Sequence, residues 1–462
     1  MEQISLGISE LRGVKSSTGG FRPVSAMEKS GLQHKTSPRK PLLTILVLLM
    51  CSVHLLLPIE RGFPTIKIVG YPLTLPIIIT FFSAVMLFFS LKGNGFFILN
   101  KYILSQMFVV VTLFVSAFLS DDIEAGLFVV LNYFTTFVLG FWVVCGFLKL
   151  GLRRQVVVVL CCVASLAAII GIFEGLFHFY LPFYKQLFLQ YQYNEFLYAM
   201  TRPDFRVFGT LGNPLTYPIA LMLCVPFVFE INRPFLRCLV LVLLFGASWL
   251  AVSTTTLILW GVLLVGVFVI SRRKGRLVLG LAILMVGMVL LSPYWMPKLA
   301  SFIDTWTAEF DFANLQNPQF VNIKIRYDLF LWAIRSYFDG DFVSLFFGYG
   351  LKSSGGAVSK LGIGRMNTLD NVYATLLFEC GLAGLGSFLL MEWGILVGSW
   401  KSAKYSLYWY AILGFAIVGL SFTTIFYSTF NFIWVASVAM LIFDLGSRQQ
   451  SGYMKNETVE LQ

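Results

Sequence analysis

The stretch VVVVLCCVASLAAIIGIFEGLFHFY, residues 156–180, contains a single formally charged residue, Glu174. The apolar core of a bilayer takes about 20 such residues in one helical span. The whole chain of 462 residues has the same character, because 58% of its residues are hydrophobic, 12% are charged and the mean hydropathy is +0.80. Soluble proteins have roughly a quarter of their residues charged. The composition therefore excludes a soluble enzyme, a disordered tail protein and a nucleic-acid binder, despite a net charge of +11.

Apolar runs joined by polar connections predict an all-α, polytopic integral membrane protein of about twelve transmembrane helices, without the alternating pattern of a barrel. The expected helices lie near residues 41–59, 72–91, 103–119, 125–148, 156–180, 215–231, 238–252, 255–270, 277–293, 372–397, 405–421 and 424–443. The seventh and eighth runs meet near Ser253 and predict either one hairpin or one long kinked helix. A disordered basic tail over 1–40, a transmembrane domain over 41–443 and a C-terminal tail over 444–462 complete the organisation.

Basic residues predict the orientation of the helices. About two-thirds of them lie in the two terminal tails and in one alternate set of connections, at Lys92, Lys101, Lys149, Arg153, Arg154, Arg233, Arg237, Arg272, Arg273, Lys274, Arg276, Lys401 and Lys404. The positive-inside rule places these connections and both termini in the cytoplasm. The opposite side has two long loops, 181–214 and, between helices nine and ten, 294–371. We expect the second loop to contain structure of its own, including a helix over 321–338 at the membrane interface.

Cysteine and histidine, which commonly bind metals, show no metal-binding pattern in this sequence. The seven cysteines fall in apolar runs, and neither they nor the three histidines have metal-ligand spacing, so we predict no metal and no cofactor. Four carboxylates, Glu174, Glu230, Glu379 and Glu392, lie within or at the ends of predicted helices. They do not align as a relay, and each is expected to face the protein interior or an interface.

Polar groups concentrate in the two long outer loops. The first loop ends in RPDFRVFGTLGNP (202–214), and the second contains FGYGLK (347–352) and RMNTLDNVY (365–373). A guanidinium just above the bilayer, beside glycine-rich backbone and a helix N-terminus, suits a phosphate anchored in lipid; a solvated surface charge is the alternative for each arginine. The candidate substrate-contacting residues are Arg202, Arg206, Asn213, Lys324, Arg326, Tyr349, Arg365, Asn371 and Tyr373.

Four segments between about residues 200 and 400 resemble the O-antigen ligase and polymerase superfamily. They are RVFGTLGNPLTYPIA (206–220), residues 326–332, the turn 348–350 and TLDNVYATLLFECGLAGLG (368–386). Members of that superfamily are bacterial inner-membrane glycosyltransferases that use polyprenyl-pyrophosphate-linked glycans. The resemblance implies a GT-C-like fold and an undecaprenyl-pyrophosphate-linked oligosaccharide as the substrate, with membrane lipid, a chain-length regulator and a flippase as partners.

The resemblance also implies roles for individual residues. Arg206 and Arg326 match the family's loop arginines and would neutralise the departing pyrophosphate without a metal. Ligases typically have His-Asn where this chain has Asp370-Asn371. Asp370 would then act as the general base that accepts the proton of the acceptor hydroxyl, and the missing histidine favours a polymerase over a ligase. An N-cap of the following helix is the alternative role for Asp370.

Aromatic residues of the loops allow two interpretations, contact with sugar rings or anchoring at the membrane interface. They are Trp295, Trp306, Tyr327, Trp332, Tyr349 and Tyr373. The sequence as a whole predicts a polysaccharide polymerase that transfers a growing glycan to a lipid-linked repeat unit on the periplasmic face. The alternatives are a ligase that transfers the glycan to lipid A core or to protein, and, in another class, a transporter or flippase.

Overall fold

In this computed structural model, the described residues are 39–56, 67–68, 71–72, 74–91, 101–182, 185, 207–251, 254–271, 318–360, 369–403, 406–420 and 431–445. The contacts define one unit, Arg39–Phe443, and a second unit made of the two terminal segments, of which only Asp444 and Leu445 are described. Residues 1–38 of the predicted N-terminal tail and the predicted helix over 277–293 lie outside the described residues, whereas Arg39 and Lys40 already belong to the first described helix.

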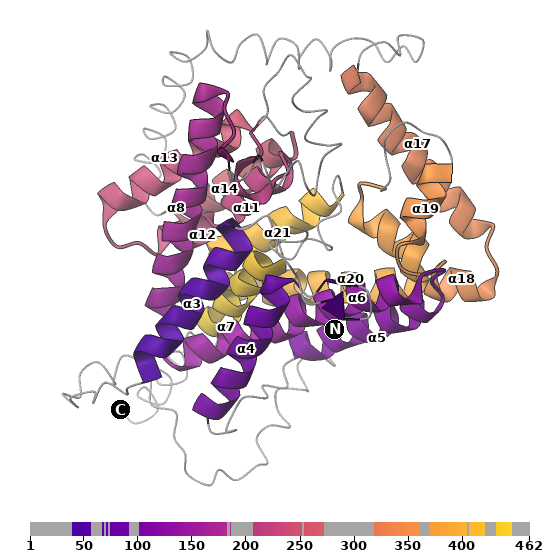
Figure 1. Cartoon of the computed structure of the whole chain (residues 1–462), viewed down its shortest axis with the longest axis horizontal. Coiled ribbons are helices and arrows are strands. Elements are labelled where there is room, and N and C mark those ends of the chain that lie inside the picture. Colours follow the sequence, from indigo (N-terminus) through magenta and orange to yellow (C-terminus); the bar gives the residue numbers. More distant parts are fainter. Residues whose placement is uncertain are drawn as a thin grey trace. The chain divides into compact units, whose positions relative to one another are not determined.

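Helices make up the described residues almost completely (Figure 1). Their order is α3 (Arg39–Leu56), β1 (Lys67–Ile68), β2 (Tyr71–Pro72), α4 (Leu75–Ser90), α5 (Lys101–Phe118), α6 (Ile123–Tyr133), the π-helix η2 (Phe134–Leu139), α7 (Gly140–Lys149), α8 (Arg153–Phe177), η3 (Gly209–Leu211), α11 (Thr216–Leu223), α12 (Val225–Phe229), α13 (Pro234–Leu250), α14 (Thr254–Ile270), α17 (Pro318–Phe338), α18 (Phe342–Phe347), α19 (Ser353–Lys360), α20 (Val372–Ala403), α21 (Leu407–Gly419) and a last helix, Asn431–Leu445. The strands form one short antiparallel pair. The prediction of an all-helical chain is confirmed for the part that the structure describes.

Each predicted apolar run within the described residues contains a helix, and the predicted loop helix over 321–338 corresponds to α17. Three helical stretches are long and apolar enough to cross a membrane, namely Ile123–Lys149, Arg153–Phe177 and Val372–Trp400. The other apolar helices have 10–17 residues. A span needs about 20 residues when it is perpendicular to the bilayer, so the number of twelve spans stays a prediction.

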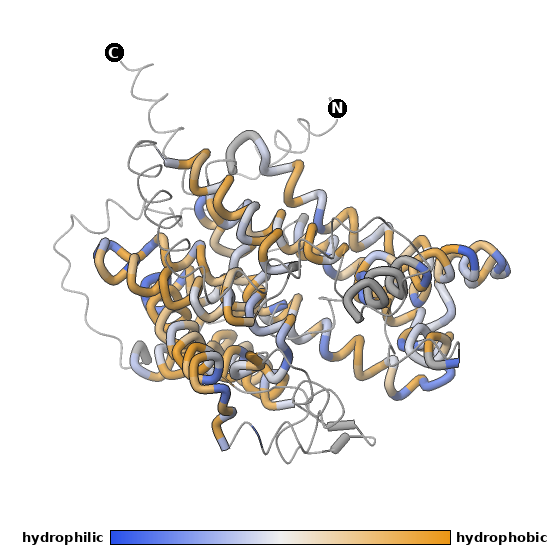
Figure 2. The backbone as a smooth tube through the Cα atoms, turned by 90° about the horizontal axis from the view of Figure 1, so that it is seen from above, coloured by the Kyte–Doolittle hydropathy of each residue, from blue (hydrophilic) through white to orange (hydrophobic). Residues whose placement is uncertain are grey.

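The distribution of polarity is that of a protein in lipid. Phe89 on α4 and Leu104 on α5 are 66% and 65% exposed, whereas Gln106 and Thr112 on α5 are buried. Figure 2 shows hydrophobic residues along the length of the helices. Soluble proteins bury most of their large apolar side chains and expose their polar ones, and wide apolar surfaces mark contact with a membrane or a partner. The chain therefore has the composition and the surface of a helical membrane protein.

Helices α13 and α14 decide between the hairpin and the long kinked helix predicted near Ser253. The rings of Phe245 and Trp260 meet edge to face with centroids 4.7 Å apart. In one continuous helix these two residues would be about 22 Å apart. The chain therefore turns sharply between the two helices, which excludes one straight helix and favours the hairpin. Beyond this contact α13 packs on α8, and α14 packs on α21.

Hydrogen bonds between connections agree with the predicted alternation of sides. The Thr210 hydroxyl donates to the carbonyl of Leu55 at 2.6 Å, which joins the last turn of α3 to the connection before α11. The Ser120 hydroxyl donates to the carbonyl of Leu351 at 2.7 Å, which joins the α5–α6 connection to the region between α18 and α19. The sequence predicts the end of α3 and these three connections on the outer side.

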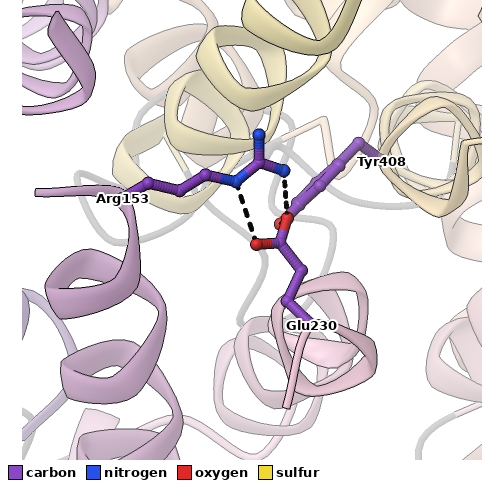
Figure 3. Close-up of polar contacts among 3 residues, drawn as sticks. All are labelled: Arg153, Glu230 and Tyr408. Carbon is purple, nitrogen blue, oxygen red and sulfur yellow. Dashed lines mark hydrogen bonds and ion pairs between the residues drawn. The ribbon is translucent and has the colours of Figure 1, made fainter. Parts of the chain in front are cut away.

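A second group of contacts joins connections that are predicted on the inner side (Figure 3). Arg153, the first residue of α8, binds Glu230 after α12 with Nε 3.0 Å from Oε2 and Nη2 2.5 Å from Oε1. The Tyr408 hydroxyl at the start of α21 donates to the same Oε1 at 2.6 Å. Three connections of one predicted side thus meet at one carboxylate. Which side faces the cytoplasm stays a prediction.

Candidate functional site

Helix α20 folds back on itself at Gly381, where φ is 63° and ψ is −164°. Along a straight helix Tyr373 and Glu392 would be about 28 Å apart. The Tyr373 hydroxyl nevertheless lies 2.9 Å from Oε2 of Glu392. The parts of α20 before and after Gly381 therefore turn towards each other.

The apolar run predicted near 372–397 is helical, but Gly381 divides it into two segments. The first segment of α20 is 372–380 and the second segment is 382–403. The apolar residues continue through the turn, so the hydropathy pattern does not reveal it. A left-handed glycine is what permits the reversal, since an L side chain rarely adopts that backbone conformation.

The Gly-Tyr-Gly turn before α19 completes the backbone hydrogen bonds at this break. A helix end leaves its last carbonyls without partners in the helix. Here the backbone N–H of Tyr349 donates to the carbonyl of Phe378 at 2.9 Å, and that of Gly350 donates to the carbonyl of Glu379 at 3.1 Å. The Ser116 hydroxyl of α5 donates to the carbonyl of Glu379 at 2.5 Å. The turn is thus docked on the break in α20.

Tyr349, predicted to contact substrate, links α17 to this turn. Its hydroxyl donates to the carbonyl of Ser336 at 2.6 Å, and its ring centroid lies 4.9 Å from that of Phe378. The half-buried ring packs against the cluster between α17, α19 and the first segment of α20. These contacts give Tyr349 a structural role, and its contact with a sugar stays a prediction.

Asp370 and Asn371 form the turn that starts α20. Asp370 has a φ of 47°, which aspartate tolerates better than most residues; left-handed non-glycine residues cluster at functional sites. Asn371 Oδ1 accepts the backbone N–H of Ala374 at 3.0 Å, and Asn371 Nδ2 donates to the carbonyl of Leu420 at 2.9 Å. Asn371 is therefore the residue whose side chain caps the helix, the role considered as the alternative for Asp370. Asn371 also ties the turn to the end of α21.

Helix α17 lies against this turn. Leu329 of α17 belongs to one buried cluster with Leu369, the residue directly before Asp370. Lys324 and Arg326 lie on α17, with Arg326 about one turn before Leu329. The structure thus joins the segment that contains two predicted basic residues to the segment that contains the predicted base.

The remaining predicted residues lie elsewhere. Asn213 Oδ1 accepts the backbone N–H groups of Leu215 at 2.8 Å and Thr216 at 3.3 Å, so that it caps the start of α11. Helix α11 packs on α13 and α14. Outside the described residues are Arg202, Arg206 and Arg365.

The motif before α11 is built around a buried carboxylate. Glu174 of α8 is fully buried, and its Oε2 accepts the backbone N–H of Gly209 at 2.8 Å. The Tyr217 hydroxyl donates to the carbonyl of Ala167 on the same helix at 2.8 Å. The segment RVFGTLGNPLTYPIA therefore has a packing role in its described part, besides the role that the family resemblance implies.

Two further buried carboxylates adjoin the candidate site, although the sequence did not assign them to it. Glu379 accepts the Ser354 hydroxyl at 2.5 Å, and Glu392 lies beside the hydroxyl of Tyr373. Each also has a second carboxylate oxygen without a hydrogen-bond partner. A lone acidic residue in an apolar run was the available signal, because burying a carboxylate in a membrane helix is costly.

The site that these contacts define is the Asp370–Asn371 turn with Tyr373, where α17, α20 and α21 meet. Within the described ranges, no group of three or more His, Cys, Asp and Glu side chains could hold a metal ion. A scan against models of protein families finds no match for the chain, and a search of curated proteins finds none either. The apolar helices and the apolar surface are compatible with a helical membrane protein, and its activity is a matter for proposal.

Proposed function

We propose that the protein is a polysaccharide polymerase of the bacterial inner membrane, with about twelve transmembrane helices and a GT-C-like fold. It transfers a growing glycan from undecaprenyl pyrophosphate to a lipid-linked repeat unit on the periplasmic face. The observation that supports this proposal most is the packing of α17, with Lys324 and Arg326, against the turn of Asp370 and Asn371. The resemblance of these segments to the O-antigen ligase and polymerase superfamily supports it from the sequence.

The proposed chemistry is a displacement at the anomeric carbon of the donor glycan. The acceptor hydroxyl oxygen forms the new glycosidic bond while its proton passes to the carboxylate of Asp370. The bond from the anomeric carbon to the pyrophosphate oxygen breaks, and the pyrophosphate leaves with the electron pair. Arg206 and Arg326 stabilise the negative charge that develops on it.

The test is polymer synthesis by Arg326→Ala at a normal level of the protein. Loss of one group that stabilises developing charge lowers rates by about 100-fold or more, so we expect short glycans or none. Arg335→Ala is the matched control, because Arg335 lies on the same helix with an exposed side chain, and it should leave chain length unchanged. Normal polymer in both Arg206→Ala and Arg326→Ala would contradict the mechanism.

The glycans of a deletion strain separate polymerase from ligase. Without a polymerase, single repeat units remain on the lipid carrier. Without a ligase, long chains remain there.

Transport is the second candidate function, and one structural observation favours it. Glu174, Glu379 and Glu392 are buried in helices, and α20 is broken at Gly381; transporters place their sites at broken helices and buried ionisable groups. A flippase predicts that lipid-linked repeat units accumulate on the cytoplasmic face of a deletion strain. Accumulation on the periplasmic face would exclude it.

A further inference from the structure

Tyr373 and Glu392 join the two segments of α20 from opposite sides of the break. The Tyr373 hydroxyl lies 2.9 Å from Oε2 of Glu392 and 2.8 Å from the carbonyl oxygen of Ala416 on α21. Glu392 is fully buried, and its Oε1 has no hydrogen-bond partner among the described residues. One hydroxyl therefore connects both segments of α20 with α21.

The Tyr373 hydroxyl is the donor in both contacts. Its one proton is shared between Oε2 of Glu392 and the carbonyl oxygen of Ala416. Glu392 is thus the acceptor that draws the first segment of α20 to the second, and Ala416 is the acceptor on α21.

Tyr373 and Asn371 connect the contact with Glu392 to the candidate site. Tyr373 lies two residues after Asn371, which holds the carbonyl of Leu420 at the end of α21. Ala416 and Leu420 belong to the same end of α21. The turn of Asp370 is therefore held both by α21 and by the contact between the two segments of α20.

We propose that Glu392 is a positioning residue for the transfer reaction: through Tyr373 it holds the first segment of α20 against the second and so fixes the Asp370–Asn371 turn. We call this contact the α20 latch. The attachment of one segment of α20 to the other is argued from the contacts alone. Its effect on catalysis rests on the proposed polymerase function. Glu392 itself contacts no substrate in this proposal.

The test compares Glu392→Leu with Glu392→Gln in purified full-length protein. Leucine removes the contact with Tyr373, which keeps its bond to Ala416, and it leaves no buried polar group unpaired. Glutamine keeps a carbonyl oxygen that can accept from Tyr373 at the same place. Ser248→Ala on α13 is the control, because it removes a buried intrahelical bond, from Ser248 to the carbonyl of Leu244, away from α20.

The first readout is hydrogen–deuterium exchange, which does not depend on activity. In Glu392→Leu we expect faster exchange in 372–380 and unchanged exchange in 382–403; Glu392→Gln and Ser248→Ala should behave like the wild type. Unchanged exchange in Glu392→Leu would overturn the latch, whatever the activity.

The second readout is the turnover of lipid-linked repeat units in vitro. Misplacement of a reacting group by about 1 Å costs roughly 100-fold in rate, so Glu392→Leu should lower kcat by about that factor with little change in KM, and Glu392→Gln should restore it. Faster exchange with unchanged kcat would overturn the positioning role. If the wild type forms no polymer, the proposed function fails, and the exchange experiment still decides whether the latch exists.

Discussion

Gly381 shows how one residue determines the geometry of the candidate site. A Cβ atom built on Gly381 would lie 2.4 Å from the carbonyl carbon of Phe346 and 2.6 Å from the backbone nitrogen of Phe347. Its φ of 63° is itself rare for any residue with a side chain. The close approach of α18 and the reversal of α20 both require a glycine at this position.

Gly381→Ala should therefore destabilise the protein, because it adds backbone strain of about 1–3 kcal/mol and a clash with backbone atoms. Gly386→Ala is the matched control in the second segment of α20, since a Cβ there would meet nothing within 4 Å and alanine favours a helix. Thermal unfolding in detergent should show a lower Tm for the first variant and an equal or higher Tm for the second. Equal Tm values for Gly381→Ala and the wild type would contradict the reversal at Gly381.

At the scale of elements, α18 depends on Asp341, the residue directly before it. Asp341 Oδ1 accepts the backbone N–H of Ser344 at 2.8 Å, which caps α18. The backbone N–H and then the hydroxyl of Ser344 hold the pKa of the Asp341 carboxyl below its ordinary value of 3.8. Helix α18 packs on α5 and α20. The Asp341 cap stabilises α18 and thereby helps to hold α20 in its broken form.

The cap should weaken on acidification. A lowered pKa means that the stabilisation is complete above the ordinary value and is lost as the pH falls through the lowered one. Hydrogen exchange of 342–347 should be faster in Asp341→Ala than in the wild type at neutral pH, and the two should converge as the pH falls through the lowered pKa of Asp341. Asp339→Ala, at an exposed neighbour, should match the wild type at every pH. A difference between Asp341→Ala and the wild type that persists in acid would contradict the assignment.

The contact of Arg153, Glu230 and Tyr408 holds α8, α12 and α21 together at one end. Arg153 uses two nitrogen atoms, a geometry that lysine cannot reproduce. The Arg153 and Glu230 side chains are 32% and 24% exposed, so water and salt screen part of the attraction.

A double-mutant cycle should measure the pair. Arg153→Lys and Glu230→Gln should each lower stability, and the double variant should lose less than the sum, with a coupling of about 1 kcal/mol or less. Arg154→Lys is the control, because Arg154 is the exposed neighbour in the sequence, and it should change little. Additive losses in chemical unfolding would show that the two side chains do not interact.

At the scale of the whole molecule, the alternation of sides can be tested with cysteines. In a variant in which the exposed Cys162 and Cys238 are replaced by serine, Asp339→Cys should react with a membrane-impermeant maleimide in intact cells. Arg154→Cys should react only after permeabilisation, because the predicted topology places it in the cytoplasm. Labelling of both introduced cysteines from the same side of the membrane would contradict the prediction that successive connections lie on opposite sides.

The sequence predicted the membrane class and the helices because both depend on local composition. An apolar run such as 156–180 is a helix in lipid whatever its neighbours are, since its backbone groups must be paired within the run. The same reasoning predicted a helix within the long loop, which is α17.

Only the tertiary structure decided how these pieces meet. The reversal of α20 depends on the clash-free approach of Phe346 to Gly381, and the latch joins residues that a straight helix would hold about 28 Å apart. The capping by Asn371 instead of Asp370 likewise depends on backbone directions at the turn. Local composition is the same for a straight helix and a folded one, so the sequence alone determined the elements of this protein, and long-range packing determined the geometry of its candidate site.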